Sequence, residues 1–282
     1  MGLRINTNVA SLNAQRNLGS TRINMNKSLE KLSSGQRINR AGDDAAGLAI
    51  SENLKAQIKG LGQAQRNAED GVSLVQIAEG ALGEVSNILI RLRELSVQAA
   101  SDTIGSTERK FLNVEFEQLT SEVDRIANST EFNRVPLLNG TGAVFDIQIG
   151  TRNDPISDRL TFDASSADVN VAALGLNLAS VSDKISAQNS LTSIDQAIIS
   201  VSGIRADFGA LQNRLQSTVN NIQVSVENLS SANSRVRDTD VAAETAELTK
   251  QNILMQAGTT VLSQANSSTN TALSLIQAAS QR

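Results

Sequence analysis

Apolar residues recur at every seventh position over long stretches of this chain. In its C-terminal third, seven successive positions of one such register are apolar: Ile194, Val201, Phe208, Leu215, Ile222, Leu229 and Val236. A repeat of seven turns only slowly around an α-helix, so it predicts a long helix packed lengthwise against a partner. At about 1.5 Å per residue, the stretch corresponds to a rod of roughly 60 Å.

Two further stripes in the first half supply partners for this rod. One repeats by seven through Leu54, Leu61, Ala68, Val75, Leu82 and Leu89, with Ala78, Val85 and Leu92 in the second seam position. The other alternates steps of four and three through Leu112, Phe116, Leu119, Val123 and Ile126. The polar segment 101–106 lies between them and predicts a turn. Three matching stripes predict a helical bundle.

The middle of the chain changes to a period of two. Phe145, Ile147 and Ile149 alternate with polar residues, and the alternation resumes at Leu160 and Phe162 after a segment of turn residues. This pattern predicts a β-hairpin at about residues 143–163. Two strands alone are marginally stable in water, so we expect the hairpin to pack on the bundle.

Both ends of the chain carry narrower apolar stripes. Their neighbours are mostly Asn, Gln, Ser, Thr and Ala, with few charges to form a solvated face. We expect the two ends to pair, and the pair to leave apolar surface that further copies of the chain cover. The residues predicted to mediate this polymerisation are Leu18, Met25, Leu29, Leu32, Val241, Leu248, Met255, Leu262 and Ile276.

The predicted fold is therefore mainly α: a long antiparallel helical bundle or coiled coil with one small β-hairpin, plus paired terminal helices. Residues 1–43 with 238–282 are expected to form an inner terminal-helix domain, and residues 44–237 a rod domain. A subunit whose self-contact joins two different patches builds an open helical polymer unless the rotation closes. The alternative from periodicity alone is a monomeric coiled-coil domain with frayed ends.

The composition excludes most catalytic chemistry. The chain has 282 residues without Cys, His, Trp or Tyr, which removes Ser-His-Asp and Cys-His pairs, zinc sites of nitrogen and sulfur ligands, and disulfides. A formal net charge of −4 argues against a nucleic-acid or anionic-membrane partner. We expect no enzymatic activity, no cofactor, no metal and no membrane partner; the first twenty residues also lack the apolar core of a cleaved secretory signal.

Four motifs resemble those of one family, the bacterial flagellins. Residues 34–50 (SGQRINRAGDDAAGLAI) are similar to the family's amino-terminal signature. Residues 5–8 (INTN), 92–99 (LRELSVQA) and 256–266 (QAGTTVLSQAN) also match. The resemblance covers residues 1 to about 140 and 180–282.

This resemblance implies a subunit of the flagellar filament, a hollow helical homopolymer that serves as a propeller. It further implies secretion through the flagellar type III channel, an extracellular location, and contacts with an export chaperone and with cap and junction proteins. The interval from Pro136 to Ile194 is too short for a large outer domain, so the chain resembles a minimal flagellin. A hook-filament junction protein, which shares the same ends, is the alternative.

The chain departs from the family pattern in three places. Arg134 follows Phe132-Asn133 where flagellins usually have Gly, residues 267–270 replace a stretch that often contains Pro, and the chain continues through residues 278–282. We therefore expect differences from the family in the entry to the hairpin and in the lining of the channel.

Adjacent carboxylates at Asp43 and Asp44 could be interpreted as an acid/base or metal site. Their Gly- and Ala-rich surroundings supply no third ligand type, which favours helix capping or a contact with an arginine. We predict that Arg37 or Arg40 pairs with Asp43 or Asp44, within one subunit or between subunits.

Three residues match a receptor-binding patch by family resemblance. Arg91, Leu95 and Glu115 correspond to positions that bind Toll-like receptor five in flagellins sensed by this animal innate receptor. The alternative is that Arg91 and Glu115 are solvated and that Leu95 contacts a neighbouring protofilament.

Overall fold

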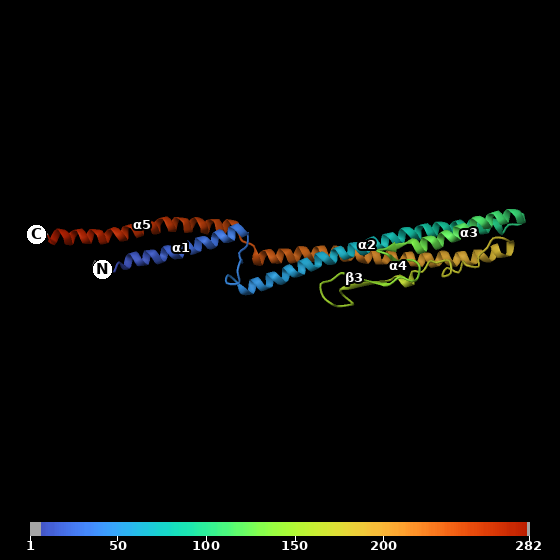
Figure 1. Ribbon diagram of the computed structural model, residues 1–282, viewed down its shortest axis with the longest axis horizontal. Coiled ribbons are helices and arrows are strands. Elements are labelled where there is room, and N and C mark those ends of the chain that lie inside the picture. The colour runs from blue at the N-terminus through green and yellow to red at the C-terminus, as the bar shows by residue number, and fades with distance from the viewer. Residues whose placement is uncertain (1–6, 281–282) are drawn as a thin grey trace. The chain divides into compact units, whose positions relative to one another are not determined.

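A computed structural model describes residues 7–280 of the chain, with side chains beyond residue 268 given only at Thr271 and Ser274. The described part is mainly α, as predicted, with five α-helices (Figure 1). These are α1 (Val9–Ser34), α2 (Ala45–Ala99), α3 (Ser106–Ser129), α4 (Lys184–Arg237) and α5 (Val241–Ser280). The chain divides into two compact units, one of residues up to 56 and from 229 onward, the other of residues 57–228.

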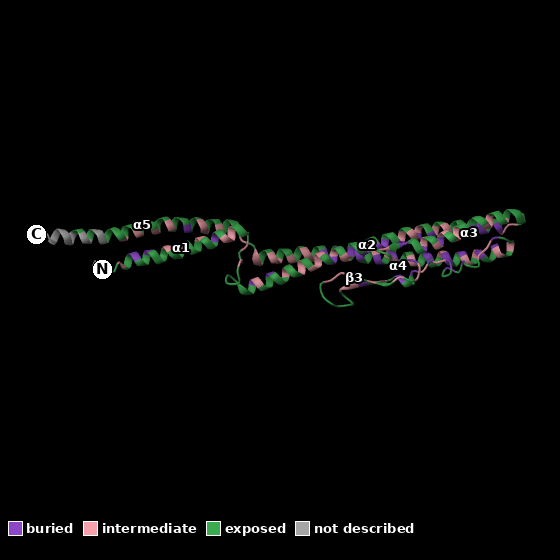
Figure 2. Ribbon diagram, in the orientation of Figure 1, coloured by how far each residue is buried: buried purple, intermediate pink, exposed green. Residues whose placement is uncertain are grey.

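The core of the second unit is formed by the three predicted stripes. On α2, Ala68, Val75, Leu82 and Leu89 are fully buried, and they face buried residues of α4 and α3 such as Phe208 (Figure 2). The predicted bundle of heptad stripes is confirmed in this region. Leu54, Leu61, Leu229 and Val236, which continue the two long stripes, are only half-buried.

The polar segment between α2 and α3 is the predicted turn. Arg109 of α3 reaches back to it, donating from Nε to the carbonyl of Ala99 at 2.8 Å and from Nη2 to that of Ser101 at 2.8 Å. These carbonyls lie at the C-terminal end of α2, where no intrahelical donor is available. The guanidinium therefore caps α2 and fixes the start of α3 against it.

The predicted β-hairpin is present as β3 (Val144–Gln148) paired antiparallel with β4 (Arg159–Asp163). Phe162 of β4 lies 4.8 Å from Phe208 of α4 and 6.3 Å from Phe145, measured between ring centroids. Asn67 of α2 donates to the carbonyl of Gln148 at 3.0 Å. The hairpin thus packs on the helices, as its small size requires.

A second, shorter strand pair was not predicted. Strands β1 (Glu131–Phe132) and β2 (Val135–Pro136) are joined by Asn133 and Arg134, both with positive φ (50° and 66°). Two such central residues make the tight turn that matches the twist of a hairpin. After β4, the short helix η1 (Ala164–Ser166) and an irregular return bury Val169, Leu176 and Val181 against the core.

Candidate assembly surface of the terminal helices

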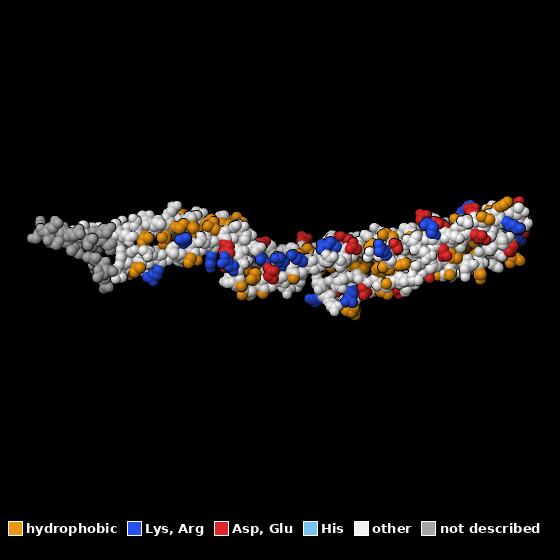
Figure 3. Space-filling model, in the orientation of Figure 1, with side chains coloured by type: hydrophobic (Ala, Val, Ile, Leu, Met, Phe, Trp, Pro, Cys, Tyr) orange, Lys and Arg blue, Asp and Glu red, His pale blue; other side chains and the backbone are white. Residues whose placement is uncertain are grey.

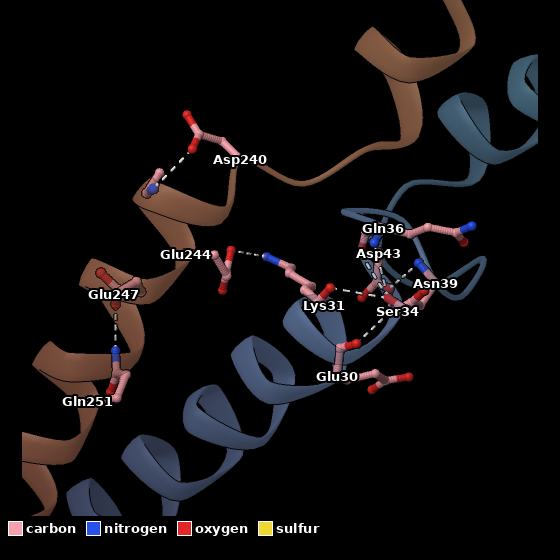
Figure 4. Close-up of polar contacts among 11 residues, drawn as sticks. Glu30, Lys31, Ser34, Gln36, Asn39, Asp43, Asp240, Glu244, Glu247 and Gln251 are labelled. Carbon is pink, nitrogen blue, oxygen red and sulfur yellow. Dashed lines mark hydrogen bonds and ion pairs between the residues drawn. The ribbon is translucent and has the colours of Figure 1, made fainter. Parts of the chain in front are cut away.

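Helices α1 and α5 form an antiparallel pair within the first unit. Near one end, Lys31 Nζ lies 3.4 Å from Glu244 Oε2 (Figure 4). Near the other, Asn8 Nδ2 donates to the carbonyl of Ala265 at 2.8 Å, and Ser11 Oγ donates to Asn266 Oδ1 at 2.9 Å. The pairing of the two ends expected from their stripes is therefore present within one chain.

The seam of this pair contains most of the residues predicted to mediate polymerisation. They are half-buried and follow steps of seven: Leu18, Met25 and Leu32 on α1, and Leu248, Met255 and Leu262 on α5. Gly258 allows close approach, because a Cβ there would lie 3.0 Å from Leu18 Cδ1. Each stripe thus meets the other helix of the same chain.

Several buried positions of the seam are polar. Ser11 and Ser28 on α1 and Gln251 on α5 are less than a tenth exposed. Gln251 Nε2 donates to Glu247 Oε1 at 2.6 Å (Figure 4). Polar residues at seam positions lower the stability of a coiled coil while fixing its register. The pair is therefore held by less apolar contact than a seam of leucines would supply.

Large aliphatic side chains point away from this seam. Leu12 and Ile23 of α1 are 50% and 60% exposed, and Ile253 of α5 is 60% exposed. Leu12 and Ile23 share one face, because eleven residues make about three helical turns. The other exposed aliphatic residues of the pair are Val9, Leu29, Val241, Leu254 and Val261. Figure 3 shows apolar side chains spread along these two helices.

The exposed set only partly coincides with the predicted one. Leu29 and Val241 are in both, whereas Ile23 and Ile253 fall outside the heptad register and were not predicted. The sequence feature that could have identified Ile23 and Ile253 is a large aliphatic residue on the helix face opposite the heptad stripe. The side chain of Ile276 lies outside the described residues.

Two connectors join the terminal pair to the neighbouring helices, one to the start of α2 and the other to the end of α4. Gly35, with φ of 71°, ends α1, and a β-bridge joins Gln36 to Asp238. The amide of Arg37 donates to the carbonyl of Arg237 at 2.6 Å, and Thr239 donates to Gly35 at 3.0 Å. These backbone hydrogen bonds hold the two connectors side by side.

Asp43 and Asp44 cap the backbone of the first connector. Asp43 Oδ2 accepts from the amides of Arg40 at 3.1 Å and Asn39 at 3.3 Å. The hydrogen bond from Arg40, followed by that from Asn39, lowers the pKa of the Asp43 carboxyl, against the opposing effect of desolvation. Asp44 Oδ1 accepts from the amide of Gly47 at 2.9 Å, at the start of α2.

The arginines predicted to pair with these carboxylates have other partners within the chain. Arg40 Nε lies 2.9 Å from Glu30 Oε1, and Arg37 Nη2 donates to the carbonyl of Val236 at 2.6 Å. Among the described residues, neither arginine forms an ion pair with Asp43 or Asp44. A pairing between subunits stays a prediction.

The residues of the predicted receptor patch divide into two kinds. Arg91 lies on the surface, with Nη2 2.9 Å from Glu115 Oε1 and Nη1 3.0 Å from Glu94 Oε2. The hydrogen bond to Glu115, then that to Glu94, raises the pKa of the Arg91 guanidinium. Leu95 is fully buried in the core. A contact of Leu95 with another molecule stays a prediction, and in this fold its side chain packs inside the core of its own chain.

Other kinds of site lack support in the described part of the chain. None of its helices combines the length and apolar character needed to cross a membrane. Over the same residues, no three or more Asp or Glu side chains lie together in a way that could hold a metal ion.

Comparison with known proteins identifies the family. The model of the bacterial flagellin N-terminal helical region matches residues 5–143, and that of the C-terminal helical region matches residues 191–276. A flagellin of Halalkalibacterium halodurans is 45% identical over 97% of this chain and 99% of its own length. The flagellar filament 33 kDa core protein of Treponema phagedenis is 42% identical, with coverage of 97% and 99%.

A solved structure agrees with this comparison. The crystal structure of Bacillus cereus flagellin superposes with a TM-score of 0.51 at 35% identity, covering 60% of this chain and 94% of that one. The relatives match nearly end to end and are named as flagellins or filament core proteins, which favours the filament over the hook-filament junction. With its paired terminal helices and helical core, this chain belongs to the bacterial flagellin family and is a structural subunit of the flagellar filament.

Proposed function

We propose that copies of this chain polymerise through the outward face of the α1–α5 pair. The observation that carries the proposal is the row of exposed aliphatic side chains at Leu12, Ile23 and Ile253. In addition, residues 251–280 contain no Asp, Glu, Lys or Arg. A helix of about 30 residues without charge has no strongly solvated face, so burial between subunits removes its apolar surface from water.

In this arrangement, residues 1–43 with 238–282 form the inner tube around the channel, and residues 44–237 form the surrounding wall. The half-buried seam residues of α1 and α5 serve polymerisation indirectly, because they hold the two helices in one register. The antiparallel contacts at Lys31 and Asn8 support such a paired inner domain. Arg37, Arg40, Asp43 and Asp44 lie exposed in the connector. In the filament they would make polar contacts between subunits in addition to, or in exchange for, their contacts within the chain.

Export through the flagellar type III channel would bring the subunit to the outside of the cell. We include an export chaperone and the filament cap and junction proteins among its partners. The support is membership of the family, together with a chain free of disulfide-forming cysteines.

Substitutions on the outward face test the assembly proposal. Ile23→Asn combined with Ile253→Asn should abolish elongation from filament fragments, measured by light scattering and electron microscopy. The matched control is Ile199→Asn on α4, whose side chain is similarly exposed at 63%. The far-ultraviolet circular dichroism of each variant monitors the helices. Normal elongation by the double variant would contradict the proposal, and short adaptors in place of filaments from the parent would favour a junction role.

We further propose that any contact with Toll-like receptor five involves Arg91 and Glu115 and not Leu95. Arg91 and Glu115 form a surface ion pair, so a receptor can reach both. In a reporter-cell assay, monomeric Arg91→Ala should signal less than the parent at equal thermal stability. Equal signalling by the two proteins would remove this partner.

A further inference from the structure

Asn139 and Gly140 form the only Asn-Gly pair in the sequence, and they lie in the loop between β2 and β3. The amide nitrogen of a glycine in this position can attack the side-chain carbonyl carbon of the asparagine before it. Because glycine has no Cβ, the approach of its nitrogen is unhindered. The pair is therefore a candidate for a covalent change that needs no enzyme and no cofactor.

Thr141 places two hydrogen-bond donors on the carbonyl oxygen of the Asn139 side chain. Asn139 Oδ1 accepts from the backbone amide of Thr141 at 3.1 Å and from Thr141 Oγ1 at 2.7 Å. Attack on the carbonyl carbon turns Oδ1 into an oxyanion, and hydrogen bonds to an ionised acceptor are about twice as strong as those between neutral groups. Both contacts therefore strengthen as the new bond forms, which lowers the barrier. Thr141 thus supplies a two-donor oxyanion hole.

The backbone around Asn139 is held in place while the reacting groups remain open to water. The backbone carbonyl of Asn139 accepts from Asn170 Nδ2 at 2.9 Å, and that of Leu138 accepts from the amide of Val169 at 2.9 Å. Asn139 is half-buried and Thr141 is exposed. The two donors are therefore kept on the carbonyl oxygen, and water can reach the product of the attack.

The fold itself requires glycine after Asn139. Gly140 has a φ of 71°, in the left-handed region that disfavours residues with a Cβ. A Cβ at this position would also collide with the side chain of Asp168. A bulkier residue, which would slow the attack by hindering the nitrogen, therefore does not fit here. The reactive pair is a consequence of the backbone path through this loop.

We propose that Asn139 deamidates in the folded chain, with Thr141 stabilising the transition state. The Gly140 nitrogen bonds to Asn139 Cγ, the Cγ–Nδ2 bond breaks, and the proton of the Gly140 amide leaves with the side-chain nitrogen as ammonia. Water then opens the cyclic imide at either carbonyl, which gives aspartate or isoaspartate at position 139. Each product adds a negative charge to the loop that Asp168 contacts. The site lies in the second unit and does not depend on polymerisation.

Incubation of the full-length monomer at mildly alkaline pH, followed by peptide mass spectrometry, tests the proposal. Labelling by a protein-isoaspartate methyltransferase identifies the isoaspartate product. The reference is the same chain unfolded in guanidinium chloride, where Thr141 does not hold the carbonyl oxygen. Position 139 should react at least as fast in the folded chain as in the unfolded one. Asn128, whose Nδ2 donates to the carbonyl of Asp124 within α3 at 2.9 Å, is the internal control and should stay unmodified in the folded chain.

Thr141→Val removes the hydroxyl donor and keeps the shape of the side chain. This variant should react about tenfold more slowly than the parent when folded, because one oxyanion donor is lost, and at the parent's rate when unfolded. Thr141→Ser keeps the hydroxyl and should retain the parent's rate, and circular dichroism checks that both variants fold. Slower reaction of the folded parent than of the unfolded chain, an unchanged rate in folded Thr141→Val, or an equal loss in Thr141→Ser would each overturn the proposal.

Discussion

At the scale of single residues, the β1–β2 turn shows how backbone geometry can conflict with a side chain. Asn133 and Arg134 both occupy the left-handed region. Asn tolerates this conformation, whereas Arg incurs the steric cost of its Cβ, about 1–2 kcal/mol. The sequence already marks Arg134 as the position where flagellins usually have Gly. The structure supplies the physical reason for that usual choice.

Replacement of Arg134 by Gly should therefore stabilise the second unit. Relief of the left-handed strain is partly offset by the greater freedom of Gly in the unfolded chain, which leaves a net gain of about 0.5–1 kcal/mol. The expected rise in the midpoint of thermal unfolding is roughly 1–4 °C. Arg134→Ala keeps the Cβ and serves as the control; an equal rise with Ala would show that the charge, and not the backbone, is responsible.

The connector carries a pH dependence at Asp43. Its folded pKa lies below the ordinary value of 3.8 because it accepts hydrogen bonds from the amides of Arg40 and Asn39. The stabilisation is therefore complete above that value and is lost as pH falls through the folded pKa. In an NMR titration, the amide signals of Arg40 and Asn39 should move with a midpoint below 3.8, and Asp43→Asn should abolish this movement. A midpoint at or above 3.8 would contradict the capping role.

At the scale of elements, the α1–α5 pair has a weak seam. Its heptad spacing is evident from the sequence, and the half-burial of Met25 and Met255 agrees with it. The buried Ser28 and Gln251 interrupt the apolar contact. A pair of helices held in this way is stabilised further when neighbouring subunits cover its outward face.

Gln251→Leu should make this pair more stable in the monomer. Burial of a Leu side chain contributes about 1.5–3 kcal/mol, and loss of the hydrogen bond to Glu247 subtracts about 0.5–1.5 kcal/mol. We expect a net gain of about 1 kcal/mol, visible as a later loss of helical circular dichroism on heating. Gln256→Leu, at an exposed position of α5, is the control. If both variants melt alike, position 251 does not lie in the seam in solution.

At the scale of the whole molecule, the buried core and the terminal helix pair are formed by different parts of the sequence. The buried cluster of the second unit runs from Ala68 to Val219 and includes no residue of α1 or α5. Folding of this part therefore needs no contact from the chain ends. We propose, in contrast, that assembly depends on the ends.

A chain trimmed of residues 1–40 and 240–282 should thus remain a helical monomer. Its thermal unfolding should match the transition of the second unit in the full chain, and it should not elongate filament fragments. Analytical ultracentrifugation and electron microscopy check the two expectations. Growth of normal filaments from the trimmed chain would show that assembly does not depend on the terminal helices.

Periodicity along the chain is enough to predict the kind of each long element, and the motifs are enough to predict the family. Repeats of seven and of two follow directly from the geometry of helices and strands, so the bundle stripes and the β3–β4 hairpin could be predicted. The β1–β2 pair could not, since two residues per strand are too few to show a period.

Which side chains are covered depends on how the helices pack in the folded chain. Leu95 is buried while Val97, two residues along the same helix, is half exposed at 52%, because α2 turns one face to its neighbours in the core. Ile23 and Ile253 are exposed for the complementary reason, since α1 and α5 meet through their other faces. The ion-pair partner of Arg40 is likewise Glu30 of α1 and not the neighbouring carboxylates that the sequence pattern indicated. A period in the sequence identifies the faces of a helix, but burial also depends on where the other helices lie.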